Sequence, residues 1–61
     1  MVDVKAERKK LGLTQKQVSE LSGITRAMVG HIETGTANIS VKIAKRYEKI
    51  FGIPWYNFFE N

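Results

Sequence analysis

Residues 14–35 read TQKQVSELSGITRAMVGHIETG, and this stretch decides the fold. Thr14 and Gln17 have the Thr-x-x-Gln spacing of a capping box, which marks the start of a helix. Gly23 is typical of the position just past a helix end, because glycine adopts the left-handed backbone conformation without steric cost. Thr25 then suits the cap of a second helix. The stretch therefore predicts two helices joined by a very short turn.

The apolar residues of this stretch fall at helical spacing. Two helices joined by so short a turn cross steeply, and we expect four apolar side chains to meet at the elbow: Val18, Ile24, Val29 and Ile32. This is helix-turn-helix geometry, in which the second helix can enter the major groove of DNA. Other corners between two helices give a similar pattern, so the spacing alone does not identify the function.

Similar signals divide the rest of the chain. Gly12 and Gly52 predict the ends of one helix before this stretch and one after it. Ser40 suits the cap of that later helix, and Pro54 suits the first position of a fifth, short helix. We expect an all-α fold, with one compact five-helix domain over residues 1–61.

The same periodicity predicts which side chains face the core. We expect inward-facing apolar stripes in the first, second and fourth helices: Val4 with Leu11, Val18 with Leu21, and Val41, Ala44, Tyr47 and Phe51. No segment alternates with period two for long enough to predict a strand.

The composition limits the class of protein. The chain has 61 residues, room for one small core, and no cysteine, which excludes disulfides and thiolate metal sites. So small a core leaves no cavity for a cofactor, and a single histidine, His31, without a cysteine partner predicts no metal site. No paired acid and base predict catalysis. The start of the chain, MVDVK, is charged, and no stretch approaches the roughly 18 apolar residues of a membrane span. We therefore expect a cytoplasmic protein with no membrane partner, no small-molecule substrate and no enzymatic activity.

The charge balance suggests a partner. Ten Lys and Arg residues against six Asp and Glu give a net charge of +4, and the isoelectric point is about 9.7. Such a basic balance fits nucleic-acid binding, although many small soluble proteins are basic for solubility alone. Most of the basic side chains outside the central stretch are expected on a solvated face, with Lys10 and Lys42 the exceptions nearest to DNA: Lys5, Lys9, Lys10, Lys42, Lys45, Arg46 and Lys49.

The detailed pattern resembles the phage-repressor (Cro/CI-like, xenobiotic-response-element) helix-turn-helix family. The resemblance covers almost the whole chain and rests on Arg8, Gly12-Leu13-Thr14-Gln15, Val18, Gly23-Ile24-Thr25, Val29, Ile32-Glu33-Thr34-Gly35, and the segments 38–42 and 51–59. Three positions depart from the family pattern: Ser19 where alanine is usual, Ile39 where proline is common, and Glu48 where a small apolar residue is usual. None of these positions faces DNA in the family.

The resemblance implies that residues on the third helix touch base edges: Arg26, Ala27, Gly30 and His31. An arginine can bond guanine O6 and N7 together, and an alanine can contact a thymine methyl. His31 can donate to or accept from a purine N7. Gly30 has two interpretations, a close approach of the helix to DNA or a relief of packing inside the protein.

Other positions of the resemblance imply phosphate contacts: Gln15, Lys16, Thr25, Met28, Thr36, Ala37 and Asn38. Gln15 stands at a helix start, where free N–H groups and the positive end of the dipole attract an anion, although it can also simply favour the cap. Met28 can instead cover the edge of the core. Phosphate contacts position a protein on DNA but carry no sequence information.

Two further expectations concern structure and assembly. The family places Arg8 and Glu33 together, and we predict an ion pair between them. Among the aromatic residues near the end of the chain, we expect Trp55 and Phe58 to close the core. Tyr56 or Phe59 would then be exposed, which suggests a dimer contact; a monomer with a capped surface and stacking of bases on these rings are the alternatives.

The sequence thus carries two hypotheses from different classes. The first is a sequence-specific regulator of transcription that binds double-stranded DNA, a small dimeric repressor of the phage or mobile-element kind, encoded by a bacterium or a phage, that reads the major groove with residues 26–34. The second is a protein-interaction module, such as an antitoxin or adaptor on the same scaffold. An exposed Arg26 and Gln15 on one face favour the first hypothesis.

Overall fold

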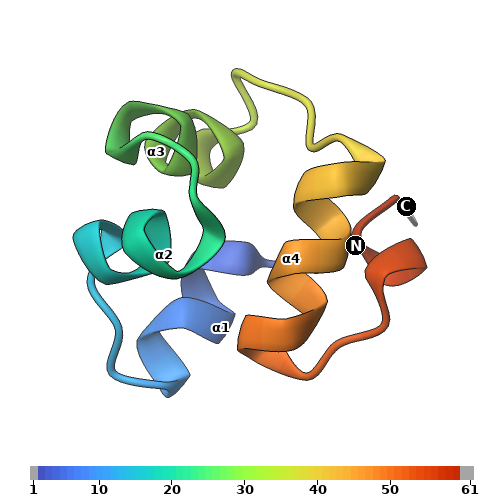
Figure 1. Cartoon of the computed structure of the whole chain (residues 1–61), viewed down its shortest axis with the longest axis horizontal. Helices are drawn as coiled ribbons and strands as arrows, with labels where there is room; N and C mark the ends of the chain where they lie inside the picture. The colour runs from blue at the N-terminus through green and yellow to red at the C-terminus, as the bar shows by residue number, and fades with distance from the viewer. Residues whose placement is uncertain (1, 60–61) are drawn as a thin grey trace.

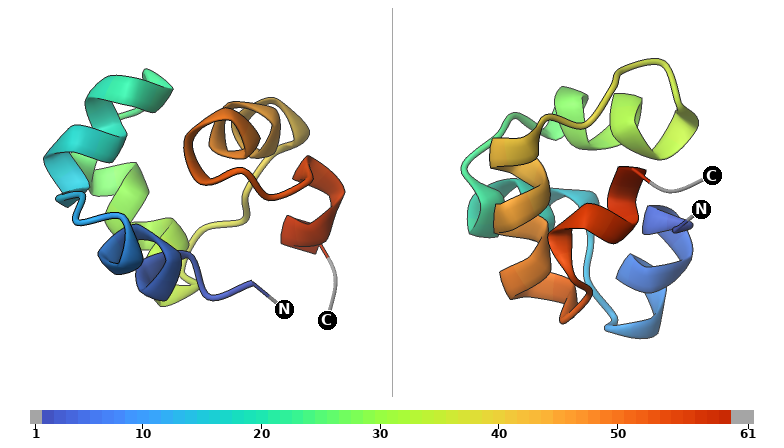
Figure 2. Two further views of the ribbon diagram at one scale, coloured as in Figure 1. Left: turned by 90° about the horizontal axis from the view of Figure 1, so that it is seen from below. Right: turned by 90° about the vertical axis from the view of Figure 1, so that its right-hand side faces the viewer.

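The computed structural model describes residues 2–59 of the chain. These residues form four α-helices followed by a short 3₁₀-helix and no strand: α1 (Val4–Lys10), α2 (Gln15–Ser22), α3 (Arg26–Thr34), α4 (Val41–Phe51) and η1 (Trp55–Phe59) (Figure 1). α3 packs on α2 and α1, α4 packs on α2, and η1 folds back onto α4 (Figure 2). The prediction of an all-α fold is confirmed. Within residues 2–59 no helix is long and apolar enough to cross a membrane.

The predicted helix starts are confirmed at all three caps. The hydroxyl of Thr14 accepts from the N–H of Gln17 at 3.1 Å, and the Gln17 side chain accepts from the N–H of Thr14 at 2.8 Å, which completes the capping box. Thr25 and Ser40 cap α3 and α4 in the same way. These caps satisfy N–H groups that the first turn of a helix leaves free, and each cap stabilises the fold by about 1 kcal/mol.

The end of α1 forms a Schellman motif. Gly12 has φ +69°, and its N–H donates to the Lys9 carbonyl while the N–H of Leu13 donates to the Arg8 carbonyl. The chain therefore reverses within two residues. This tight reversal brings Leu13 back over Arg8, which matters for the polar contacts described below.

The core lies where α2, α3 and α4 meet. Val18, Val29 and Tyr47 are fully buried and form its centre, and half-buried Ile24 and Ile32 pack against them. The expected apolar contacts at the elbow are therefore present. Burying such side chains removes apolar surface from water, which is the main stabilising term of so small a domain.

Three residues of the predicted apolar stripes are exposed instead. Leu11, Leu21 and Val41 expose 52%, 62% and 48% of their surface, so their assignment to the core is wrong. Each lies at a helix end: Leu11 follows α1, Leu21 is in the last turn of α2, and Val41 begins α4. A stripe predicts the inner face of a helix but not how far the neighbouring helix extends along it.

The fifth helix differs from the expectation. η1 is a five-residue 3₁₀-helix, so the count of five α-helices is not confirmed. Pro54 precedes η1, and its carbonyl accepts from the N–H of Asn57 at 3.0 Å, three residues on. Such tight bonding is typical of short helical segments at chain connections.

Polar contacts to main-chain groups tie the helices together. The guanidinium of Arg46 donates to the carbonyl of Ser22 at 3.0 Å, which joins α4 to the end of α2, so the expectation that Arg46 is only solvated is wrong. Two of the three departures from the family pattern also make such contacts. The Ser19 hydroxyl donates to the Ile24 carbonyl at 2.5 Å across the turn, and the Glu48 carboxylate accepts from the N–H of Trp55 at 3.2 Å. The third, Ile39, packs on the core.

Candidate nucleic-acid interface

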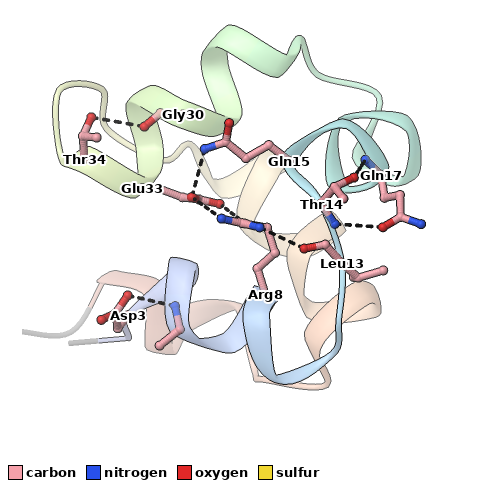
Figure 3. Close-up of polar contacts among 10 residues, drawn as sticks. Asp3, Arg8, Leu13, Thr14, Gln15, Gln17, Gly30, Glu33 and Thr34 are labelled. Atoms are coloured by element: carbon pink, nitrogen blue, oxygen red, sulfur yellow. Dashed lines mark hydrogen bonds and ion pairs between the residues drawn. The ribbon is translucent and has the colours of Figure 1, made fainter.

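A buried polar network joins α1, α2 and α3. Glu33 accepts from Arg8 through both carboxylate oxygens, at 2.7 Å from Nε and 3.2 Å from Nη2. The guanidinium also donates to the Leu13 carbonyl at 2.9 Å, where the Schellman motif returns the chain. The two charged side chains expose only 10% and 2% of their surface. The structure thus brings Arg8 and Glu33 together as an ion pair, seen at the centre of Figure 3.

The same network holds Gln15 at the start of α2. Its amide nitrogen donates to Glu33 Oε1 at 3.1 Å, so this oxygen accepts from both Arg8 and Gln15. An amide nitrogen has two N–H groups, and Glu33 uses one of them. The second N–H and the amide oxygen therefore have a fixed position beside the first turn of α2 (Figure 3). We call Arg8, Gln15 and Glu33 the polar network.

One face of α3 is free of the core. Val29 and Ile32 point inward, whereas Ala27 and His31 on the opposite side are exposed and Gly30 is half-buried. This division follows from the helical repeat, since residues three and four apart share a face. Arg26, at the first position of α3, is also exposed.

This face of α3 lines an open hollow on the surface. Five residues expected at DNA line it: Gln15, Ala27, Gly30, His31 and Thr36. Glu33 and Thr34 also line it, as does Lys5 from α1. The sequence alone predicts a solvated face for Lys5, because nothing in it relates the first turn of α1 to α3. Within residues 2–59, Lys5 forms no ion pair.

The space around Gly30 bears on its two interpretations. A Cβ atom added to Gly30 would lie 3.8 Å from the amide nitrogen of Gln15, which is an ordinary van der Waals distance. Gly30 also lies in the right-handed region, since the positive-φ glycines are at other positions: Gly12, Gly23, Gly35 and Gly52. Neither packing nor backbone conformation therefore requires a glycine here.

The remaining residues expected at phosphates do not line the hollow. Lys16 and Asn38 are exposed, and Ala37 and Met28 are half-buried. The hydroxyl of Thr25 accepts from the N–H of Met28 at 3.1 Å as the cap of α3. Of the two lysines expected nearest to DNA, Lys10 pairs with Glu7 at 3.1 Å and Lys42 is exposed.

The aromatic residues form two groups. Tyr47 packs edge-on against Phe51 and Phe58, with ring centroids 5.4 and 5.9 Å apart, and we call these three residues the aromatic cluster. Phe58 therefore packs on the core as expected. Trp55 is half-buried outside the core centre, 5.3 Å beneath the ammonium of Lys45, so its expected role in closing the core is wrong.

Tyr56 and Phe59 lie outside the core. They expose 56% and 44% of their surface and pack edge-on against Trp55, with ring centroids 5.9 and 6.1 Å from it. The sequence suggested that one of the two would be exposed, and both are. They form an exposed aromatic surface at the end of the described chain.

Within residues 2–59 no three His, Asp or Glu side chains gather in a way that could hold a metal ion. The features that do gather are an exposed helix face beside a helix start, with basic and amide side chains around one hollow. A second helix joined by a tight turn to the one before it, with its outer face free, defines a helix-turn-helix domain.

Comparison with known proteins gives the same class. The model of the helix-turn-helix family HTH_3 matches residues 4–57, so the chain belongs to this family. Proteins of this family bind DNA and regulate transcription. The chain is also similar to a protein of Bacillus subtilis (strain 168) described as the uncharacterized HTH-type transcriptional regulator YqaF. The two are 36% identical over 58 residues, which cover 95% of this chain and 76% of the relative. No solved structure matches the chain.

Proposed function

We propose that this protein is a sequence-specific regulator of transcription that reads the major groove of double-stranded DNA with the exposed face of α3. Arg26, Ala27, Gly30 and His31 contact base edges. We propose that it represses transcription by occupying its site on bacterial or phage DNA in the cytoplasm. The proposal includes no catalytic step and no cofactor.

The observation that carries this proposal is the polar network. A buried Glu33 holds Arg8 and Gln15 at fixed distances, so the start of α2 and the outer face of α3 form one rigid surface. A helix N-terminus with a positioned amide suits a phosphate, and the exposed helix beside it suits a groove. Burying a charged pair costs free energy unless its groups are hydrogen-bonded. In this protein the hydrogen bonds of Glu33 connect α3 to Gln15 at the start of α2.

Phosphate contacts then come from Lys5, which lines the hollow, together with the residues that the family resemblance implies: Gln15, Lys16, Thr25, Met28, Thr36, Ala37 and Asn38. Binding of duplex DNA should therefore weaken steeply with salt, because each neutralised phosphate releases condensed counterions. A gel-shift or fluorescence titration at several salt concentrations tests this. Affinity that stays flat from low to moderate salt contradicts the proposal.

Arg26 should carry the largest share of base discrimination. Arg26→Ala should lower the preference for the specific site over unrelated duplex by about 5- to 150-fold, since a bidentate contact to guanine is worth about 1–3 kcal/mol. Lys49→Ala is the matched control, because Lys49 lies on α4 beside Leu21 and Ile50, away from the hollow. An equal loss for both variants excludes readout by Arg26.

We also propose that the regulator acts as a homodimer. The supporting observation is the exposed aromatic surface of Tyr56 and Phe59, because aromatic residues are enriched in interfaces. Two copies related by a two-fold axis would bind half-sites roughly 34 Å apart. Analytical ultracentrifugation of the wild type and of the double variant Tyr56→Ser with Phe59→Ser checks this: only the wild type should sediment as a dimer.

The same exposed surface supports a second candidate function, a protein-interaction module of the antitoxin or adaptor kind. In that case Arg26→Ala leaves the biological activity unchanged, whereas the double variant at Tyr56 and Phe59 abolishes it. The first proposal predicts that Arg26→Ala on its own strongly reduces the activity.

A further inference from the structure

Thr36 makes a contact that no phosphate role requires. Its hydroxyl oxygen lies 2.9 Å from Nδ1 of His31, so a residue of the loop after α3 holds the imidazole of a residue on the exposed face of α3. The main chain of Thr36 is itself fixed, because its N–H donates to the His31 carbonyl at 2.9 Å. The contact therefore orients the ring, and Nε2 is the ring nitrogen without a hydrogen bond to another group within residues 2–59.

The neighbouring groups indicate where the hydroxyl proton of Thr36 goes. The His31 carbonyl, 3.3 Å away, already accepts from the N–H groups of Gly35, Thr36 and Ala37. These N–H groups and the Thr34 hydroxyl, also 3.3 Å away, share the two lone pairs of this oxygen, so a bond from the Thr36 hydroxyl to it at 3.3 Å is weak. The second candidate, the Thr34 hydroxyl, lies 3.1 Å from the Thr36 hydroxyl, whereas Nδ1 of His31 is the nearest acceptor at 2.9 Å.

We infer that Thr36 is a specificity-determining positioning residue: it donates its hydroxyl proton to Nδ1 of His31 and thereby leaves the imidazole proton on Nε2, facing the DNA. This inference rests on the proposed function. It replaces the phosphate contact that the family resemblance implies for Thr36, and that the proposed function includes, with a different role. His31 then presents a donor to the groove, and a donor matches the acceptors of a base edge.

The chemistry of the major groove fixes what such a donor selects. Guanine presents two acceptors, N7 and O6, whereas thymine presents one, O4, beside its methyl group, adenine presents N7 beside a donor, and cytosine presents only a donor. His31 should therefore favour guanine at the base pair it faces. A ring without Thr36 can turn over and offer either nitrogen, so the preference should relax at that base pair alone.

The first test observes the free protein. His31 is the one histidine of the chain, so a long-range proton–nitrogen spectrum in mildly alkaline buffer shows a single imidazole. The wild type should carry its proton on Nε2. Thr36→Val, which keeps the shape but loses the hydroxyl, should shift the Nδ1 resonance, and Thr36→Ser should leave it nearly unchanged. A proton on Nδ1, or identical Nδ1 resonances in wild type and Thr36→Val, overturns the inference.

The second test selects binding sites from random duplex DNA. Thr36→Val should lower the preference for guanine at one base pair by about fivefold, the scale of one hydrogen bond, and Thr36→Ser should retain it. Adding Thr36→Val to His31→Ala should change this preference no further, because the two residues act through one contact. A uniform loss across all sequences is the signature of a phosphate contact and overturns the inference.

The two tests separate this inference from the proposed function. If the wild type selects no duplex, the proposed function fails and base reading by His31 fails with it. The nitrogen spectrum still decides whether Thr36 positions the ring. If the wild type selects a site but Thr36→Val selects the same site with the same preferences, only this inference fails.

Discussion

The polar network of Arg8, Gln15 and Glu33 and the aromatic cluster of Tyr47, Phe51 and Phe58 hold the domain together by different means. In the polar network, each carboxylate oxygen of the buried Glu33 binds a donor, and the contacts have fixed directions. In the aromatic cluster, packing has less direction, and the hydroxyl of the buried Tyr47 has no partner within the described residues. The directional contacts lie on the side of α3 that we assign to DNA.

This difference indicates what each region contributes. A network with fixed directions keeps Gln15 and α3 in register, which a DNA-reading surface needs. Aromatic packing contributes buried area, and it tolerates changes that keep the shape of the rings. Substitutions in the two regions should therefore differ in their effect on stability. The loss should be large where a buried charge loses its partner, and small where an aromatic ring is retained.

The largest effect should come from breaking the ion pair. Arg8→Ala should lower the free energy of unfolding by about 3–5 kcal/mol, because the Glu33 carboxylate is then buried without its cation. Urea unfolding measures this. Lys10→Ala, which breaks the exposed pair with Glu7, is the control and should cost at most about 1 kcal/mol. An unchanged melting temperature for Arg8→Ala means that the pair does not stabilise the fold.

A smaller effect of opposite sign is expected in the aromatic cluster. Tyr47→Phe keeps the ring and removes a buried hydroxyl without a partner, so stability should stay equal or rise by about 1 kcal/mol. A clear loss of stability would show that the hydroxyl has a partner and that the two regions are built alike.

The same substitution has a signature in alkaline solution. Burial, with a contribution from the negative charge of Glu33, raises the pKa of Tyr47 from 10.0 to about 12. Because the folded state favours the neutral phenol, this contribution is complete below pH 10 and is lost as the pH rises towards about 12. The free energy of unfolding should therefore fall less steeply over this range in Tyr47→Phe than in the wild type. Parallel pH curves for the two proteins contradict this account.

Gly30→Ala should separate stability from binding on the side of the polar network. Alanine is about 1 kcal/mol better than glycine inside a helix, and the added Cβ fits beside Gln15, so stability should rise. Affinity for DNA should fall, because the Cβ lies on the face that approaches the bases. Thermal unfolding and a binding titration on the same sample measure both. Lower stability supports the packing interpretation, and unchanged affinity excludes the close approach.

The smallest expected effect is on the salt dependence of DNA binding, and it compares one lysine beside the polar network with one outside it. Lys5 lines the hollow beside the polar network, whereas Lys45 lies over the ring of Trp55. Lys5→Ala should reduce the salt dependence of DNA binding by about one unit of slope, as expected for one lost phosphate contact. Lys45→Ala should leave the slope unchanged. Equal slopes for the two variants remove Lys5 from the interface.

Local signals in the sequence predicted much of this fold, and longer-range relations explain what they missed. The caps at Thr14, Thr25 and Ser40 depend on residues three positions apart, so a short sequence contains all the information. The exposure of Leu21 depends on where α4 ends beside it, which helical periodicity does not contain. The contact between Gln15 and Glu33 joins positions 18 residues apart through a packed fold.

The candidate site shows the same division. The exposed face of α3 follows from periodicity, and the pairing of Arg8 with Glu33 was expected only from the family resemblance. Lys5 at the hollow and the contact of Thr36 with His31 depend on the path of α1 and of the loop after α3. Neither position carries a spacing signal that relates it to the central stretch.

The central claim is that the outer face of α3 reads a defined DNA sequence. Selection of binding sites from random duplex DNA by the wild-type protein tests it most directly. We predict a consensus with two inverted half-sites, centred roughly 34 Å apart, as expected for a symmetric dimer. Repeated rounds of selection that enrich no sequence over the starting pool would contradict it.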